Sequence, residues 1–180
     1  MSKISSSLEL YVDELRDIWF ANGQMALVLG EVAPKAQNPK LQSMLKESQA
    51  DFAKHTEIVK SLIEAKGEVA LKKNWKEMEG LAANKIKYMI EEAPESGLVL
   101  DAAIIAQCQR ITYYGIRGFG KVWGFAKALQ LADDQTKLQS AIKEMYQSDK
   151  LMNEFAQSAV NMQAAKKRVK KLTGRSYPVL

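Results

Sequence analysis

The chain is poor in the residues that covalent and metal chemistry most often use, because its 180 residues include one cysteine and one histidine. A single cysteine, Cys108, excludes an intramolecular disulfide and fits a reducing compartment. No apolar run approaches the roughly 20 residues that cross a bilayer, and the N-terminal segment has no apolar core of a signal peptide. We therefore expect a cytoplasmic protein.

The sequence also lacks the alternation of apolar and polar residues that is typical of β-strands, and it has no internal repeat of solenoid length. What it does have is an ordinary globular composition, 47% hydrophobic and 26% charged. A chain of this length is expected to form one domain with a core of its own.

Basic charge is concentrated at the C-terminal end. Residues 166–180 carry no acidic side chain and six basic ones: Lys166, Lys167, Arg168, Lys170, Lys171 and Arg175. Subtracting these six from the net charge of +5 leaves −1 for residues 1–165, so we predict a nearly neutral body and a basic tail. Such a tail either binds a protein or another anionic partner or is simply solvated. Nothing else is typical of nucleic-acid binding, so nucleic acid is not the expected partner.

Four segments have apolar residues at spacings of three and four, the pattern of amphipathic helices. Ser6 and Glu9 stand in the spacing of a capping box at the start of the first segment, and Asn38-Pro39 is a typical start for the second. The segments run from Ser6 to near Pro34, from Asn38 to Gly67, over about residues 97–130, and from after Asp133 towards residue 168.

A stretch of about 30 residues separates the second and third segments, which is too long for a structureless loop in a compact domain. Its middle part, EMEGLAANKIKYMIEEA (77–93), predicts a shorter helix. A single long crossover of this kind is the connectivity of ferritin-like bundles. We therefore predict an all-α, ferritin-like four-helix bundle over residues 1–165, with a long, partly helical crossover between helices two and three.

Three stretches of the sequence carry a resemblance to a known family. They are LYVDELRDIW (10–19) on the first helix, KEMEGL (76–81) in the crossover and DAAIIAQCQRITYYGI (101–116) on the third helix. In combination they resemble the ferritin-like family that includes the bacterial YciE/YciF stress-associated proteins, over residues 8–157. The resemblance implies a helical bundle, a dimeric assembly and a two-metal site at the bundle centre.

The resemblance also implies where metal ligands would stand. A two-metal centre needs carboxylates that bridge the ions, usually one Glu from each of two helices and a Glu-x-x-His pair from each of the other two. This chain has no Glu-x-x-His motif. Relatives that keep acidic ligands usually have Glu in place of Asn22, Thr112 and Gly115, another near Asp51, and an acidic pair near Glu144 and Met145. We therefore expect no cofactor and predict that a former metal pocket is marked by Asn22, Ser48, Thr112, Gly115 and Met145.

An alternative keeps a reduced ligand set for iron or manganese. Asp51 and His55 share a helix face because they are four residues apart, and Glu144 on the fourth helix could complete three ligands. The competing interpretation is a buried histidine that is hydrogen-bonded to a neighbour, with Asp51 as the expected partner.

Residues 115–124 contain four glycines: Gly115, Gly118, Gly120 and Gly124. Their spacing is not that of a dinucleotide-binding loop, and no strand precedes them, so we predict a continuous helix. Each interior glycine costs roughly 1 kcal/mol relative to alanine, which predicts compensation by large neighbouring side chains, with Trp19, Phe20 and Phe52 as candidates. A small-molecule pocket beside these glycines, near Asn22, His55, Thr112, Tyr113 and Tyr114, is the alternative to a packed core.

Three functional hypotheses follow. The first, which we favour, is a non-catalytic structural or interaction protein, a homodimer that the family resemblance associates with stress. The second is a metal-binding protein with oxidase or peroxide-handling activity that uses Asp51, His55 and Glu144. The third is an envelope- or nucleic-acid-associated factor that binds through residues 166–180.

Overall fold

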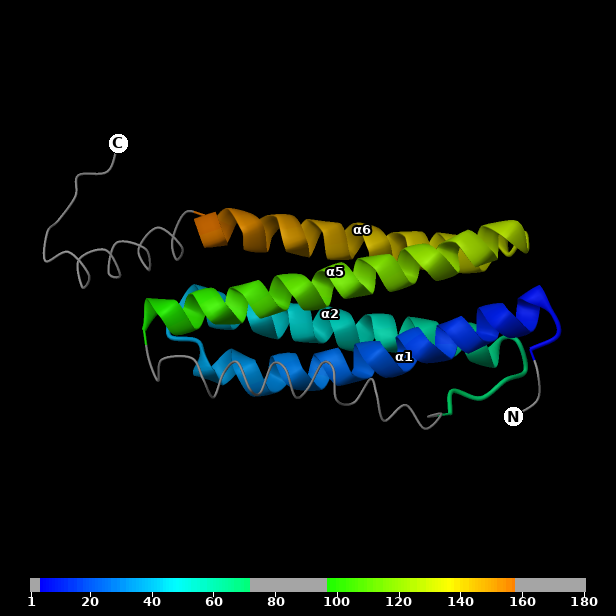
Figure 1. The fold of residues 1–180 in the computed structure, drawn as a ribbon, viewed down its shortest axis with the longest axis horizontal. Helices are drawn as coiled ribbons and strands as arrows, with labels where there is room; N and C mark the ends of the chain where they lie inside the picture. The colour runs from blue at the N-terminus through cyan, green and yellow to red at the C-terminus, as the bar shows by residue number, and fades with distance from the viewer. Residues whose placement is uncertain (1–3, 72–96, 158–180) are drawn as a thin grey trace, which may run out of the picture.

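The computed structural model describes residues 4–71 and 97–157, and the described residues form an all-α bundle without strands (Figure 1). Its elements are α1 (Ser7–Val32), a short 3-10 helix η1 (Ala33–Lys35), α2 (Pro39–Glu64), α5 (Leu98–Ala128) and α6 (Ala132–Phe155). The predicted fold class is confirmed. The predicted crossover helix, the end of the fourth helix towards residue 168 and the basic tail lie outside the described residues.

The helix starts follow from the capping residues in the sequence. The Ser6 hydroxyl accepts a hydrogen bond from the backbone N–H of Glu9 at 3.2 Å, and the Glu9 carboxylate accepts one from the backbone N–H of Ser5 at 2.7 Å. At the start of α2, the Asn38 side chain accepts from the backbone N–H of Lys40 at 2.9 Å. These side chains satisfy backbone donors that have no partner within the helix, so both predicted starts are confirmed.

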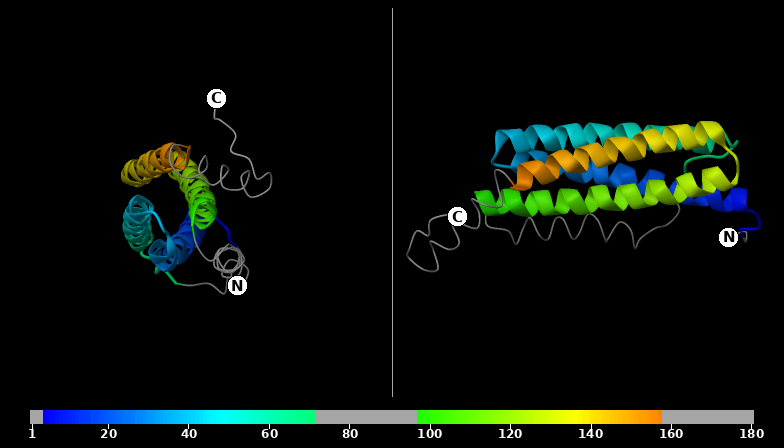
Figure 2. Two further views of the ribbon diagram at one scale, coloured as in Figure 1. Left: turned by 90° about the vertical axis from the view of Figure 1, so that its left-hand side faces the viewer. Right: turned by 90° about the horizontal axis from the view of Figure 1, so that it is seen from above.

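Two antiparallel helix pairs lie side by side, α1 with α2 and α5 with α6 (Figure 2). The end of α2 and the start of α5 lie at opposite ends of the bundle (Figure 1), so the two helices need a long connection, as ferritin-like bundles have. Among neighbouring helices of the ring, α2 and α6 are the pair in least contact. The bundle is therefore most open along the α2–α6 seam.

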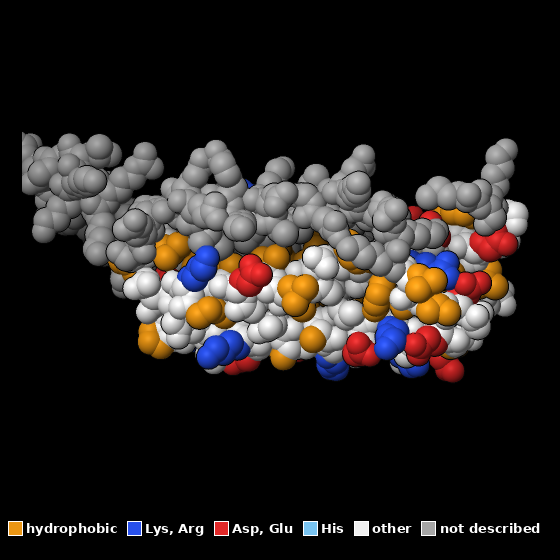
Figure 3. Space-filling model, turned by 90° about the horizontal axis from the view of Figure 1, so that it is seen from below, with side chains coloured by type: hydrophobic (Ala, Val, Ile, Leu, Met, Phe, Trp, Pro, Cys, Tyr) orange, Lys and Arg blue, Asp and Glu red, His pale blue; other side chains and the backbone are white. Residues whose placement is uncertain are grey.

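The core runs along the bundle axis in two hydrophobic clusters. One cluster lies around Leu29, Leu45 and Ile104, and the other lies around Leu15, Val59 and Phe119. Burial of side chains of this size stabilises the fold by about 1.5–3 kcal/mol each. Viewed from the α1 side, the surface mixes acidic, basic and single hydrophobic side chains, without a field of one sign on its described residues (Figure 3).

No helix in the described ranges 4–71 and 97–157 is long and apolar enough to span a membrane.

The glycines of α5 lie in one continuous helix, as predicted, but only two of them face the interior of the bundle. A Cβ on Gly115 would lie 3.2 Å from Met145 Sδ and 3.4 Å from Phe52 Cε1, and one on Gly118 would lie 3.3 Å from Ile18 Cγ1. Phe52 therefore fills space beside a glycine as predicted, whereas Ile18 takes the place expected of Trp19 or Phe20.

Gly120 and Gly124 do not fit the predicted compensation by packing. They are exposed, and among the described residues nothing lies within 4 Å of a Cβ built on either one. The prediction was wrong here because the four glycines do not share one helix face.

This difference predicts opposite effects of alanine substitutions in α5. Gly120→Ala and Gly124→Ala should each raise the free energy of unfolding by about 0.5–1 kcal/mol, because alanine restricts the unfolded chain and meets no obstacle in the folded one. Gly115→Ala is the matched control, since Met145 and Phe52 must move to admit its methyl group. Urea unfolding of the three variants checks this, and an equal gain at Gly115 would contradict it.

Candidate functional site

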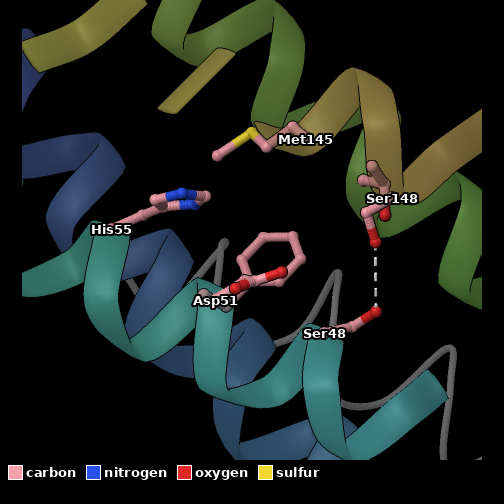
Figure 4. A pocket seen from close by; sticks show the side chains of 7 residues that line it. Ser48, Asp51, His55, Met145 and Ser148 are labelled. Carbon is pink, nitrogen blue, oxygen red and sulfur yellow. Dashed lines mark hydrogen bonds between the residues drawn. The ribbon is translucent and has the colours of Figure 1, made fainter. Parts of the chain in front are cut away.

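A cavity of ≈ 10 Å³ lies at the centre of the bundle between α2, α5 and α6 (Figure 4). A volume of this size is close to the minimum that holds one water molecule or one ion. The cavity is lined by Ser48, Asp51, Phe52, His55, Thr112, Met145 and Ser148. Residues that the sequence placed on the inward faces of α2, α5 and α6 thus meet around one small space.

His55 is buried, with 1% of its surface exposed, and Glu144 on α6 is its hydrogen-bond partner. Its Nε2 lies 2.9 Å from Glu144 Oε2, and Lys54 Nζ donates to both oxygens of the same carboxylate at 2.9 and 3.0 Å. The hydrogen bonds from Lys54 and then His55 lower the pKa of Glu144, so its carboxylate is charged at neutral pH. The expectation of Asp51 as the partner of His55 is therefore corrected.

The histidine ring packs edge-on against Phe119, with 5.8 Å between the ring centroids. Within the described part of the chain, its Nδ1 atom is buried and has no hydrogen-bond partner. A carboxylate can only accept a hydrogen bond, so Nε2 carries the proton of the Glu144 contact, and in the neutral ring Nδ1 then has a free lone pair. The buried ring thus holds an unused acceptor.

The three residues of the reduced ligand set come to the same region from two helices. His55 and Glu144 are in direct contact, and Asp51 borders the cavity that His55 lines. No group of three or more His, Cys, Asp and Glu side chains in the described ranges is placed to hold a metal ion. Binding of iron or manganese by Asp51, His55 and Glu144 stays a prediction.

All five positions of the predicted former metal pocket are buried: Asn22, Ser48, Thr112, Gly115 and Met145. They offer an amide, two hydroxyls, a hydrogen atom and a thioether, whereas a two-metal iron or manganese centre requires carboxylates that bridge the ions. The Phe52 ring lies against Gly115, where a carboxylate side chain would otherwise extend. These five positions therefore supply no carboxylate that could bridge two ions.

Cys108 is buried on α5, as predicted from its position on the inward stripe. Burial raises the pKa of its thiol to about 12, with a smaller opposing effect of a hydrogen bond from Thr112. The thiol is therefore protonated at neutral pH, and protonated thiols are poor nucleophiles and poor metal ligands.

A groove between α2 and α6 lies outside the cavity and shares Ser48, Asp51 and Ser148 with it. The groove has a volume of ≈ 600 Å³. The Ser48 and Ser148 hydroxyl oxygens are 3.4 Å apart across the seam. Neither the groove nor the role of Lys54 was predicted, because an exposed lysine beside a buried histidine has no distinctive sequence pattern.

The family model described as "Domain of unknown function (DUF892)" matches residues 6–165. The chain belongs to this family. Protein YciF of Escherichia coli strain K12 is 24% identical over 160 residues, which are 88% of this chain and 95% of YciF. The predicted resemblance to the YciE/YciF proteins is thereby confirmed.

Two solved structures are similar in fold to this chain. The crystal structure of the E. coli stress protein YciF has a TM-score of 0.79 at 21% identity and covers 88% of this chain and 99% of its own. The structure of YcfI from Rhodopseudomonas palustris has a TM-score of 0.75 at 24% identity, and the match covers 84% of this chain and 95% of YcfI. At these identities the likeness supports the fold.

Proposed function

We propose that this member of the DUF892 family is a non-catalytic ferritin-like bundle that acts as a structural or interaction protein in stress. The observation that carries this proposal is the composition of the bundle centre. Asn22, Ser48, Thr112, Gly115 and Met145 are buried and carry no carboxylate, whereas a two-metal oxidase needs bridging carboxylates. The description of YciF as a stress protein supports the cellular context.

The metal content of tag-free protein after incubation with Fe(II) or Mn(II) tests this proposal. The expected result is no stoichiometric iron or manganese, because the five positions of the former metal pocket supply no carboxylate that could bridge two ions. Roughly two ions per chain, as a two-metal centre holds, would contradict the proposal.

A second candidate function is an oxidase or peroxide-handling protein with one iron or manganese ion on Asp51, His55 and Glu144. The 2.9 Å contact between His55 and Glu144 beside Asp51 favours it. In that case about one ion per chain would bind and His55→Ala would abolish binding, since one ligand of three would be lost. Iron or manganese content that is unchanged by His55→Ala would exclude this candidate.

The same proposal includes a homodimeric assembly and a binding role for the basic tail. Several large side chains are exposed on the described bundle, among them Leu27, Tyr146 and Leu151, and a homodimer would cover part of such a surface. We propose residues 1–165 as the dimerising body and residues 166–180 as a basic tail for a protein or other anionic partner in the cytoplasm. Sedimentation equilibrium checks the dimer, and a particle of 20.1 kDa, the mass of one chain, would contradict it.

A further inference from the structure

His55 on α2 and Met145 on α6 line the central cavity from two neighbouring helices, and the hydrogen bond to Glu144 engages only one of the two ring nitrogens of His55. The His55 ring from α2 and the Met145 thioether from α6 point toward one another (Figure 4). The His55 Nδ1 atom is buried without a hydrogen-bond partner in the described chain. Burial of a polar atom without a hydrogen-bond partner is unfavourable, so a ligand that engages this atom would stabilise the site.

Glu144 prepares the ring for such a ligand. Its carboxylate accepts from Lys54 Nζ and from His55 Nε2, both at 2.9 Å, and when the ring is neutral this hydrogen bond leaves the lone pair on Nδ1. A carboxylate that holds one nitrogen of a histidine while the other nitrogen binds a metal is a recurring arrangement in metalloproteins. His55 has the same combination of one nitrogen held by a carboxylate and one nitrogen without a partner in the described chain, and it lines the cavity.

Met145 is held close to the cavity by the absence of a side chain at Gly115. Its Sδ lies 3.2 Å from the position that a Cβ of Gly115 would take. Met145 is 3% exposed, so its sulfur is shielded from bulk solvent. A thioether and the Nδ1 atom of a neutral imidazole ring form a neutral donor set that suits soft ions such as Cu(I) and suits Fe(II) or Mn(II) poorly.

The size, charge and access of the cavity agree with one small cation. The ≈ 10 Å³ volume has room for a single ion, and the Asp51 carboxylate borders it, which offsets one positive charge. The open α2–α6 groove of ≈ 600 Å³ meets the cavity at Ser48, Asp51 and Ser148. Separation of the two serine hydroxyls, 3.4 Å apart, would admit an ion from the groove.

We propose that the central cavity binds one monovalent soft cation, Cu(I), through His55 Nδ1 and Met145 Sδ. The site lies within one chain and differs in ligand chemistry from the carboxylate centre that ferritin-like bundles use. It requires no oxidation or group transfer, because Cu(I) enters and stays in the same oxidation state.

The test is anaerobic competition between the full-length protein and a chromophoric Cu(I) chelator. Wild-type protein should take up about one Cu(I) per chain, and Met145→Leu should weaken binding by at least about 10-fold, because it keeps the side-chain volume but removes the sulfur. Met152→Leu is the matched control, since Met152 is also buried on α6 but belongs to a different part of the core. It should bind as the wild type does.

Two further variants complete the test. His55→Gln should weaken Cu(I) binding about as much as Met145→Leu does, whereas Cys108→Ser should leave it unchanged. Equal Cu(I) affinity in the wild type, Met145→Leu and His55→Gln would overturn the proposal, as would loss of binding in Cys108→Ser, which would place the ion at the thiol. Circular dichroism of each variant verifies the fold, and Met145→Leu decides alone if His55→Gln does not fold.

Discussion

Asp101→Ala is expected to lower the free energy of unfolding by about 3 kcal/mol, because two charge-assisted hydrogen bonds are lost inside the protein. Asp101 is 1% exposed in the first turn of α5. Its carboxylate accepts from the backbone N–H of Gln37 at 2.7 Å and from that of Asn38 at 3.1 Å. Asp101 therefore attaches the turn between η1 and α2 to α5, which belongs to the other helix pair. In the alanine variant both backbone N–H groups lose their acceptor.

Urea unfolding of Asp101→Ala and Asp101→Asn measures this effect. The asparagine variant keeps one carbonyl oxygen and the side-chain volume, so it should lose less stability than the alanine variant, about half as much. A loss below about 1 kcal/mol in Asp101→Ala would show that water replaces the carboxylate at this turn and would contradict the account.

Asp134→Ala is expected to lower the free energy of unfolding by about 2–3 kcal/mol at the opposite end of the bundle, because a buried pair loses one partner. Asp134 accepts from the Tyr11 hydroxyl at 2.8 Å, and its carboxylate lies 2.9 Å from Lys66 Nζ. Tyr11 is fully buried. The pKa of its hydroxyl is raised, mainly by burial and to a smaller extent by the hydrogen bond to the Asp134 carboxylate. The network joins the start of α1, the segment after α2 and the start of α6.

Asp133→Ala is the matched control for Asp134→Ala, since Asp133 is the preceding residue in the same helical turn and is exposed. Asp133→Ala should lower the free energy of unfolding by less than about 1 kcal/mol, which is the contribution of an acidic residue near the start of a helix. Tyr11→Phe keeps the ring and should cost about 1–1.5 kcal/mol. If Asp133→Ala destabilised as much as Asp134→Ala, helix charge rather than the buried network would explain the loss.

The helices and their starts could be predicted because local sequence determines them. Ser6 and Asn38 cap the helices that follow through side-chain contacts within a few residues, and the apolar spacing of each helix predicted which face is buried. The length of the stretch between the second and third helices predicted the connectivity, and the resemblance of LYVDELRDIW and KEMEGL to the YciE/YciF proteins added the expected positions of the metal ligands.

The contacts at the centre could not be predicted because they depend on how helices pack. Glu144 bonds to His55 from 89 positions away, whereas Asp51, four residues from His55, was the partner that sequence spacing favoured. The network of Tyr11, Lys66 and Asp134 likewise joins segments far apart in the chain. The helical spacing placed Gly115 on the inward stripe, but it did not reveal that Met145 packs against this glycine from α6.

The most direct test of the central claim, that this bundle is not an iron oxidase, is oxygen uptake by tag-free protein supplied with Fe(II). A two-metal centre would consume oxygen at a rate proportional to protein concentration, whereas a centre without bridging carboxylates should not exceed the rate of Fe(II) in buffer. The account predicts no protein-dependent uptake. Uptake that rises with protein concentration and is lost in Glu144→Gln would contradict it.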